Sequence, residues 1–135
     1  MASSMANNFL HTQWSFVRTI EDLFYHTTMV AQGTLSITDS TWREDGMMQN
    51  TTGLNPFYQE YGLSYDKYGL HITFNDGREF YSISSPVGTH NIEHLCGDDL
   101  YSGTWSGTST TISLEWFVKG PKKNYTIQSQ YTLQL

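Results

Sequence analysis

One short stretch of the sequence carries most of the side chains that could do chemistry. His94 and Cys96 are two residues apart, and Asp99 and Tyr101 follow beyond a Gly-Asp turn. Because side chains two apart share a face of a β-strand, the turn would bring all four together. Histidine titrates near neutral pH, and a carboxylate can fix its tautomer. The spacing predicts either an acid–base site built on His94, Asp99 and Tyr101 or a hydrogen-bonded network that fixes strand register.

Two other kinds of chemistry are open to this cluster. Cys96 could act as a nucleophile with His94 as its base. Residue types that ligate zinc are also present, namely His90, His94, Cys96 and Asp99. Neighbouring in-phase side chains point in parallel and rarely align for proton transfer, and the spacing is not a recognised zinc pattern. We therefore expect no metal site and no cofactor, and a lone cysteine that acts as a small apolar side chain.

A second candidate feature is a buried charge. Arg18 is in phase with the aromatic residue Trp14, so its strand face should point inward. A buried arginine must be paired, and its candidate partners are the carboxylates of Glu44, Glu60 and Asp99. Glu44 is itself in phase with an aromatic residue, which leaves it either inside with Arg18 or on a surface hairpin. An inward Glu44 could also serve as an acid or base.

Basic residues gather in one further place. The stretch 119–125 holds three of the seven Lys and Arg residues and includes Lys123 and Tyr125. It is interpreted either as a clamp for an anionic group at the mouth of a barrel or as a solvated turn set by Gly-Pro.

The elements that must position these side chains are β-strands. Apolar and polar residues alternate with a period of two, most clearly over 112–118 and 125–134. Turn signals rich in Gly, Asn, Asp and Pro separate such runs. We expect strands at about 13–20, 28–38, 41–49, 57–66, 69–75, 78–84, 91–96, 99–106, 110–118 and 124–134. A turn or short helix should follow the first strand through Glu21–Tyr25.

Composition limits the class of protein. The chain has 135 residues, a formal net charge of −6 and a single cysteine. It therefore lacks the basic footprint of a nucleic-acid-binding protein and cannot form an internal disulfide framework. No apolar run is long enough to cross a membrane as a helix. We expect a soluble cytoplasmic protein, a monomer or small homo-oligomer, with a flexible N-terminal arm at 1–8 and a single domain at 9–135.

Aromatic residues make up 15% of the chain, whereas charged residues also make up only 15%. Eight to ten short antiparallel strands form either a closed up-and-down barrel or a sandwich, and periodicity alone does not choose between them. A barrel of about eight strands is just filled or holds one small ligand. Surplus aromatic residues, including Trp14 and Trp116, are typical of the wall of such a cavity.

Several motifs occur in a fixed order along the chain. They are Trp14-x3-Arg18-x-Ile20, Gly33-Thr34-Leu35, Trp42-x-Glu44-x-Gly46, Phe74-x-Asp76-Gly77-Arg78, His94-x-Cys96-x2-Asp99-x-Tyr101 and Gly120-Pro121-Lys122-Lys123-Asn124-Tyr125. Over about residues 9–131 their order and spacing resemble the family known as domain of unknown function 6314.

This resemblance implies an all-β, single antiparallel up-and-down β-barrel, calycin-like and similar in plan to lipocalins and avidins. It also implies that polar motif residues cluster around the interior, at Arg18, Glu44, Tyr61, Arg78, His94, Cys96, Asp99, Tyr101, Lys123 and Tyr125. Two positions depart from the family pattern. Tyr81 stands where the family often has His, and Asn124 stands where it often has Asp. If Tyr81 lines the site, a partner for proton transfer has been lost.

Three functions remain open from the sequence. The first is a barrel that binds a small apolar or aromatic molecule, oriented by Arg18, His94, Asp99 and Tyr101. The second is an enzyme on the same cavity, an isomerase, lyase or hydrolase that uses His94, Asp99 and Tyr101. The third is a structural or interaction subunit with a filled barrel. Fold alone supports all three equally.

Overall fold

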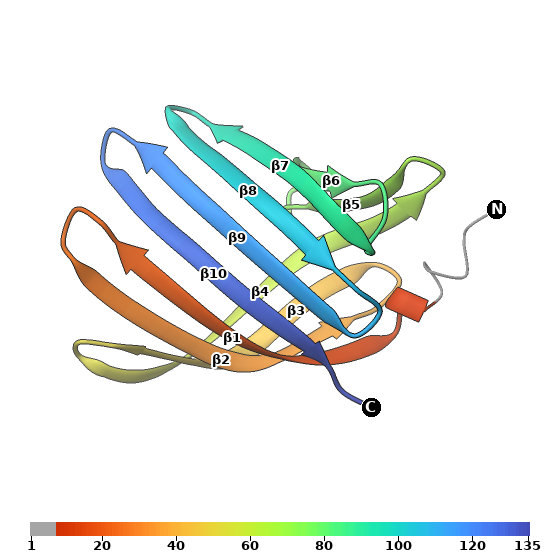
Figure 1. Ribbon diagram of the computed structural model, residues 1–135, viewed down its shortest axis with the longest axis horizontal. Coiled ribbons are helices and arrows are strands. Elements are labelled where there is room, and N and C mark those ends of the chain that lie inside the picture. Colours follow the sequence, from red (N-terminus) through yellow and green to blue (C-terminus); the bar gives the residue numbers. More distant parts are fainter. Residues whose placement is uncertain (1–7) are drawn as a thin grey trace.

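The computed structural model describes residues 8–135, and within them every long element is a β-strand (Figure 1). The ten strands are β1 (Thr12–Asp22), β2 (Thr27–Ile37), β3 (Thr41–Asn50), β4 (Gly53–Asp66), β5 (Gly69–Thr73), β6 (Glu79–Ile83), β7 (Gly88–Cys96), β8 (Asp99–Gly107), β9 (Thr111–Gly120) and β10 (Lys123–Leu133). Apart from Asn8, the predicted flexible arm at 1–8 lies outside the described residues.

All ten strands belong to one antiparallel sheet. Its order is β6-β5-β4-β3-β2-β1-β10-β9-β8-β7, so each strand pairs with its neighbours in the chain and β1 pairs with β10. The two edges of the sheet, β6 and β7, are consecutive in sequence, and the sheet curls into a nearly closed barrel. The predicted all-β, antiparallel up-and-down barrel is confirmed.

The start of the chain differs from expectation in one detail. β1 continues to Asp22, where we expected the strand to end near Ile20. Residues 23–26 then form a turn and not a helix. The Asp22 carboxylate accepts hydrogen bonds from the backbone N–H groups of Phe24 and Tyr25, at 2.9 and 3.1 Å. An Asx turn of this kind gives the backbone a partner that competes with helix formation.

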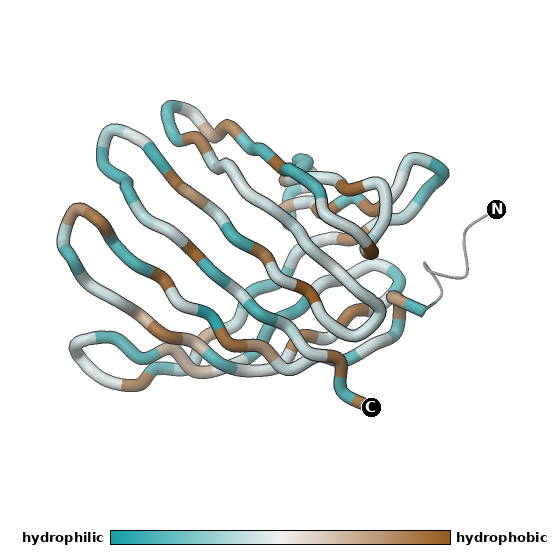
Figure 2. The backbone as a smooth tube through the Cα atoms, viewed as in Figure 1, coloured by the Kyte–Doolittle hydropathy of each residue, from teal (hydrophilic) through white to brown (hydrophobic). Residues whose placement is uncertain are grey.

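Hydrophobic and hydrophilic residues alternate along several strands (Figure 2), and this period-two pattern separates the buried face of the sheet from the exposed one. In β9, Ile112, Leu114, Trp116 and Val118 are buried and alternate with less buried residues. Directly paired residues share a face, so Phe16 of β1 meets Tyr131 of β10 inside, with ring centroids 5.6 Å apart. The inner face is therefore rich in aromatic side chains.

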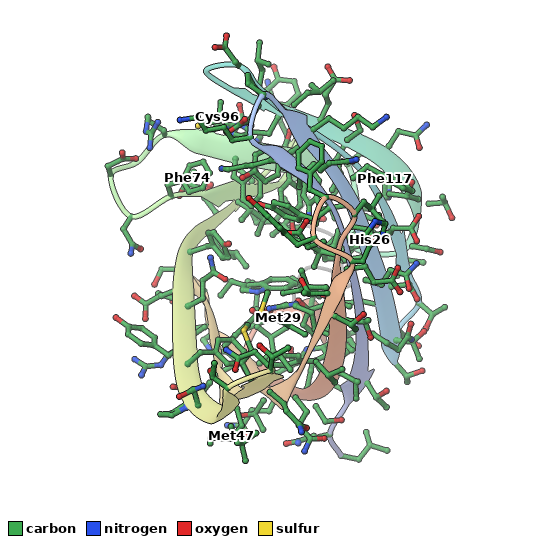
Figure 3. All side chains as sticks on the ribbon, turned by 90° about the vertical axis from the view of Figure 1, so that its left-hand side faces the viewer. His26, Met29, Met47, Phe74, Cys96 and Phe117 are labelled. Atoms are coloured by element: carbon green, nitrogen blue, oxygen red, sulfur yellow. The ribbon has the colours of Figure 1, made fainter. Side chains whose placement is uncertain are left out.

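One end of the barrel is closed by aromatic packing. Phe9 is 5% exposed, and its ring lies 6.3 Å from the rings of both Trp14 and Trp105. The indole N–H of Trp105 donates to the carbonyl of Pro86 at 3.0 Å, which holds the β6–β7 connection against β8. The β1–β2, β3–β4, β7–β8 and β9–β10 turns lie at the opposite end (Figure 1), into which Figure 3 looks.

The barrel has a seam between β6 and β7. Within residues 8–135, no strand pairing or backbone hydrogen bond joins these two strands. Ring contacts cross the seam instead, since His94 of β7 lies 5.3 Å from the rings of both Phe80 and Phe74. A groove of about 320 Å³ runs along it, lined by residues of both strands. Side chains, and not a hydrogen-bond ladder, complete the wall there.

This seam predicts a local difference in amide hydrogen exchange. Alternate N–H groups of β6 and β7 face the seam without a ladder partner, so they should exchange much faster than the amides of β1, β2 and β10. Residue-resolved exchange measured by NMR is the test. Equal protection in β6, β7 and β1 would show that the barrel is closed by hydrogen bonds in solution.

Candidate functional site

A cavity of about 390 Å³ lies inside the barrel, toward the end with the hairpin turns. Most of its wall is aromatic, and the aromatic lining residues are Trp42, Phe57, Tyr61, Phe74, Phe80, Tyr81, Tyr101, Trp116, Tyr125 and Tyr131. A few polar and charged side chains interrupt this wall. An apolar, concave site with few polar groups is the usual form of a small-molecule pocket.

A buried ion pair forms part of the cavity wall. Arg18 donates to both carboxylate oxygens of Glu44, with Nη1 2.9 Å from Oε1 and Nη2 2.8 Å from Oε2. The side chain of Arg18 is 11% exposed and that of Glu44 only 2%. Two parallel N–H···O bonds fix the guanidinium and the carboxylate in one plane. The pair joins β1 to β3 across the inner face of β2.

Three neighbouring side chains form further hydrogen bonds with Arg18 and Glu44. Arg18 Nε donates to Ser129 at 2.7 Å, and Nη2 also donates to the hydroxyl of Tyr131 at 2.8 Å. The Tyr131 hydroxyl in turn donates to Glu44 Oε2 at 2.5 Å, and the Trp42 indole donates to the same oxygen at 3.3 Å. A buried charge needs such additional bonds to repay its loss of water.

The pKa directions agree with a charged, locked pair. Burial lowers the pKa of Arg18, but its interactions with Tyr131 and Glu44 outweigh burial and leave that pKa above its usual value. Burial, followed by the charge of Glu44, raises the pKa of Tyr131 well above its ordinary range. The hydroxyl therefore keeps its proton and remains a donor to Glu44.

The register of the strands determines where Arg18 and Glu44 lie on the inner face of the barrel. Arg18 lies directly opposite Ser129 in the β1–β10 ladder, so their side chains meet on the inner face. Between Arg18 and Glu44, the inner face of β2 carries Gly33, which pairs with Phe16 on one side and Gly46 on the other. A Cβ at Gly33 would collide with the backbone of β3. Glycine at this position allows β2 and β3 to approach closely between Arg18 and Glu44.

An aromatic stack forms another part of the wall. The rings of Phe80 and Trp116 are stacked at 5.2 Å and 9°, and Phe74 stacks on Phe80 at 4.8 Å and 20°. Tyr101 meets Trp116 edge-on at 6.2 Å. Such rings are rigid and offer flat apolar surface at low entropic cost.

His94 sits beside this stack with an unused polar atom. Its ring lies 6.0 Å from that of Tyr101, and its Nε2 is buried without any hydrogen-bond partner among residues 8–135. The only other such side-chain atom there is His90 Nε2. Buried polar atoms normally have a hydrogen-bond partner. An unpaired one beside a cavity is therefore a position at which a water molecule or a ligand would form a hydrogen bond.

Tyrosine hydroxyls add neutral polar groups to the cavity. Burial is the main cause that raises the pKa values of Tyr61 and Tyr81 above their usual range. Burial, and then the interaction with Tyr101, raises the pKa of Tyr125 to about 12. These three hydroxyls therefore stay protonated near neutral pH and carry no charge.

Comparison with known proteins agrees with this architecture. The model of a family of unknown function, DUF6314, matches residues 10–133. The chain belongs to this family. A solved structure, the S-type phycobiliprotein lyase CPES from Guillardia theta, has a similar fold with a TM-score of 0.59. It is 7% identical, and the match covers 96% of this chain and 90% of that one. No curated protein matches the sequence.

The structure brings together most of the site residues predicted for this DUF6314 member. The predicted residues that line the cavity are Arg18, Glu44, Tyr61, Arg78, His94, Cys96, Tyr101, Trp116 and Tyr125. Among the three candidate partners of Arg18, the structure selects Glu44. Cys96 is exposed at the mouth and not enclosed as a small apolar side chain.

Three predicted residues lie away from the cavity wall. Trp14 packs at the closed end, where its indole donates to Thr12 at 2.8 Å. Asp99 and Lys123 form an ion pair at 3.1 Å and do not line the cavity. The shared face of the 94–101 hairpin is as expected, since His94 pairs with Tyr101 and Cys96 pairs with Asp99. The expected contact between His94 and Asp99 is absent, because Asp99 turns to Lys123 across the rim.

Sequence reasoning placed Tyr131 on an inward face but assigned no role in the site to Tyr131, Ser129 or Phe80. Ser129 and Tyr131 complete the ion-pair network, and Phe80 carries the aromatic stack. The signal for the first two was present, because both are in phase with Tyr125 on the predicted last strand. Phe80 had no such signal, since a bulge between Ile72 and Thr73 shifts the pairing of its short strand.

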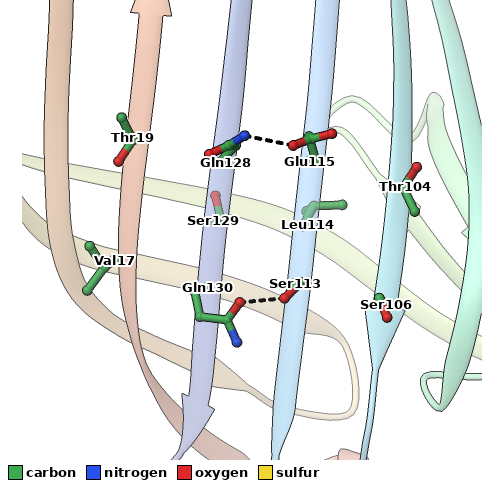
Figure 4. A pocket seen from close by; sticks show the side chains of 10 residues that line it. All are labelled: Val17, Thr19, Thr104, Ser106, Ser113, Leu114, Glu115, Gln128, Ser129 and Gln130. Atoms are coloured by element: carbon green, nitrogen blue, oxygen red, sulfur yellow. Dashed lines mark hydrogen bonds between the residues drawn. The ribbon is translucent and has the colours of Figure 1, made fainter.

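A second hollow, of about 540 Å³, lies on the outer face of β1, β8, β9 and β10 (Figure 4). Its polar side chains already pair across the strands: Gln128 donates to Glu115 at 2.8 Å, and Ser113 donates to Gln130. Among the described residues that line this outer surface, none has an unpaired buried polar atom of the kind found at the inner cavity.

Neither a metal-binding cluster nor a membrane-spanning helix occurs in residues 8–135. No group of three or more His, Cys, Asp and Glu side chains is placed to hold a metal ion, and His94, Cys96 and Asp99 do not form one. No helix in the described part of the chain is long and apolar enough to span a membrane.

The ion pair predicts an asymmetry between single and double substitutions. Arg18→Met leaves Glu44 buried without its partner and should lower the free energy of unfolding by about 3–5 kcal/mol. Arg18→Met combined with Glu44→Leu removes both charges and should recover most of that loss. Urea denaturation followed by tryptophan fluorescence measures both.

The control is Arg43→Met, which breaks the exposed pair of Arg43 with Asp45 and should change stability little. A double variant as unstable as Arg18→Met alone would show that the Arg18 side chain contributes packing and not charge balance.

Proposed function

We propose that this chain binds one small, largely aromatic molecule in the cavity of its barrel. The observation that carries the proposal is an aromatic cavity with an unpaired, buried His94 Nε2 at its wall. An empty apolar cavity alone would be a packing defect that costs stability. A polar atom left without a partner adds a second cost, which a bound ligand would remove.

The size and surface of the cavity support a ligand of this class. A volume of about 390 Å³ falls within the range of small-molecule sites, roughly 300–1,000 Å³. The stacked pair Phe80 and Trp116 offers a flat surface on which a planar ring would pack. We propose that His94 then gives the ligand its orientation through one hydrogen bond.

The solved phycobiliprotein lyase shares only its fold with this chain. Because one fold can host many functions, the support for the proposal lies in the cavity itself. The alternative of acid–base catalysis has less support in this chain. It requires a group that orients His94, whereas Asp99 is engaged with Lys123 at 3.1 Å.

Binding of the neutral fluorescent probe N-phenyl-1-naphthylamine tests the proposal. Its emission should rise and shift to the blue on titration with the wild-type chain, because the cavity excludes water. Ile127→Trp adds bulk at the cavity wall and should weaken binding at least tenfold.

The matched control is Gln128→Trp, which adds the same bulk one residue later, on the outer face shown in Figure 4. It should leave the affinity unchanged. The proposal is wrong if the wild-type chain does not bind the probe, or if Gln128→Trp weakens binding as much as Ile127→Trp. Circular dichroism establishes that both variants fold, and Ile127→Phe is a milder replacement if Ile127→Trp does not.

A further inference from the structure

We infer that the cavity selects molecules whose enclosed part carries no net charge, of either sign. This inference rests on the proposed function and narrows its ligand class. The ligand would be an uncharged aromatic molecule with one or two hydrogen-bonding groups.

The charges that line the cavity cancel one another. Among its described lining residues, the Asp, Glu, Lys and Arg side chains are Arg18, Glu44 and Arg78. Arg18 and Glu44 form the bidentate pair. The side chain of Arg78 is 68% exposed and donates to Asp76 at 2.7 Å, so its charge is balanced at the rim. The interior thus presents no uncompensated charge to a ligand.

The hydrogen-bonding positions of the Glu44 carboxylate are already occupied, so a charged ligand group would have to displace one member of the ion pair. Glu44 Oε2 accepts from Arg18, Tyr131 and Trp42, and Oε1 accepts from Arg18. An anionic ligand group could bind Arg18 strongly only by displacing Glu44, which would leave a buried carboxylate unpaired. A cationic group would have to displace Arg18 from Glu44, with the same consequence. Both exchanges leave a buried charge without its partner and are therefore strongly unfavourable.

The polar groups that remain available include the buried His94 Nε2, the Gln59 amide and the hydroxyls of Tyr61 and Tyr81. Neutral donors and acceptors of this kind suit a phenol, a carbonyl or a ring nitrogen. They do not repay the desolvation of a buried sulfonate or ammonium group.

A pair of probes tests this selectivity. N-phenyl-1-naphthylamine and 8-anilinonaphthalene-1-sulfonate share one aromatic skeleton and differ by a sulfonate group. The wild-type chain should bind the neutral probe at least tenfold more tightly, and competition should show whether both occupy the same cavity. Equal or tighter binding of the sulfonate at that cavity would overturn the inference.

One substitution should change the selectivity in a defined direction. Glu44→Gln removes the negative charge of the pair and leaves Arg18 free to meet an anion, so the preference for the neutral probe should fall at least tenfold. Glu60→Gln removes the same charge from beside Arg43 on the outer side and is the matched control. An unchanged preference in folded Glu44→Gln would also overturn the inference. If Glu44→Gln does not fold, the comparison of the two probes with the wild-type chain still decides whether the cavity excludes charged groups.

The two proposals fail in different ways. If neither probe binds in the cavity, the proposed function is wrong and the charge selectivity has no site. If both probes bind there with equal affinity, the proposed function stands and only the charge selectivity is wrong.

Discussion

The structure depends on a charge pair that is buried on the inner face of the barrel and must keep its hydrogen-bond partners there. Arg18 and Glu44 come from β1 and β3, and the groups that complete their bonding, Ser129 and Tyr131, come from β10. A slip of one residue in β1 or β10 would turn one partner outward and leave the other buried and unpaired. The pair therefore specifies the register of the strands around it and occupies volume that an apolar core would otherwise fill.

One end of the barrel is filled by packed side chains, and the cavity lies toward the other end. At one end, Phe9, Trp14 and Trp105 fill the interior and seal it. Toward the other end, the aromatic side chains line a space of about 390 Å³ that they do not fill. The seam between β6 and β7 lies beside this space, and its wall is completed by the rings of Phe80 and His94. The least hydrogen-bonded part of the sheet and the unpaired histidine thus coincide.

The fold could be predicted from the sequence because its strands have a strict period of two and short, recognisable turns. The same phase argument correctly placed Arg18 and Trp116 on the inner face, but it left Glu44 open between the interior and a surface hairpin. It could not choose among the possible partners of Arg18, since that choice depends on which strands become neighbours in space. The position of Asp99 could not be predicted either, because its choice of Lys123 over His94 is a matter of side-chain direction across the rim.

A crystal structure of the chain with N-phenyl-1-naphthylamine would show where an aromatic ligand binds. We expect the probe inside the barrel, beside the stacked rings of Phe80 and Trp116, with its amine within hydrogen-bond distance of His94 Nε2. We also expect the bidentate contact between Arg18 and Glu44 to persist in the complex. A probe bound on the outer face, or held inside by an Arg18 that has left Glu44, would overturn the proposed site.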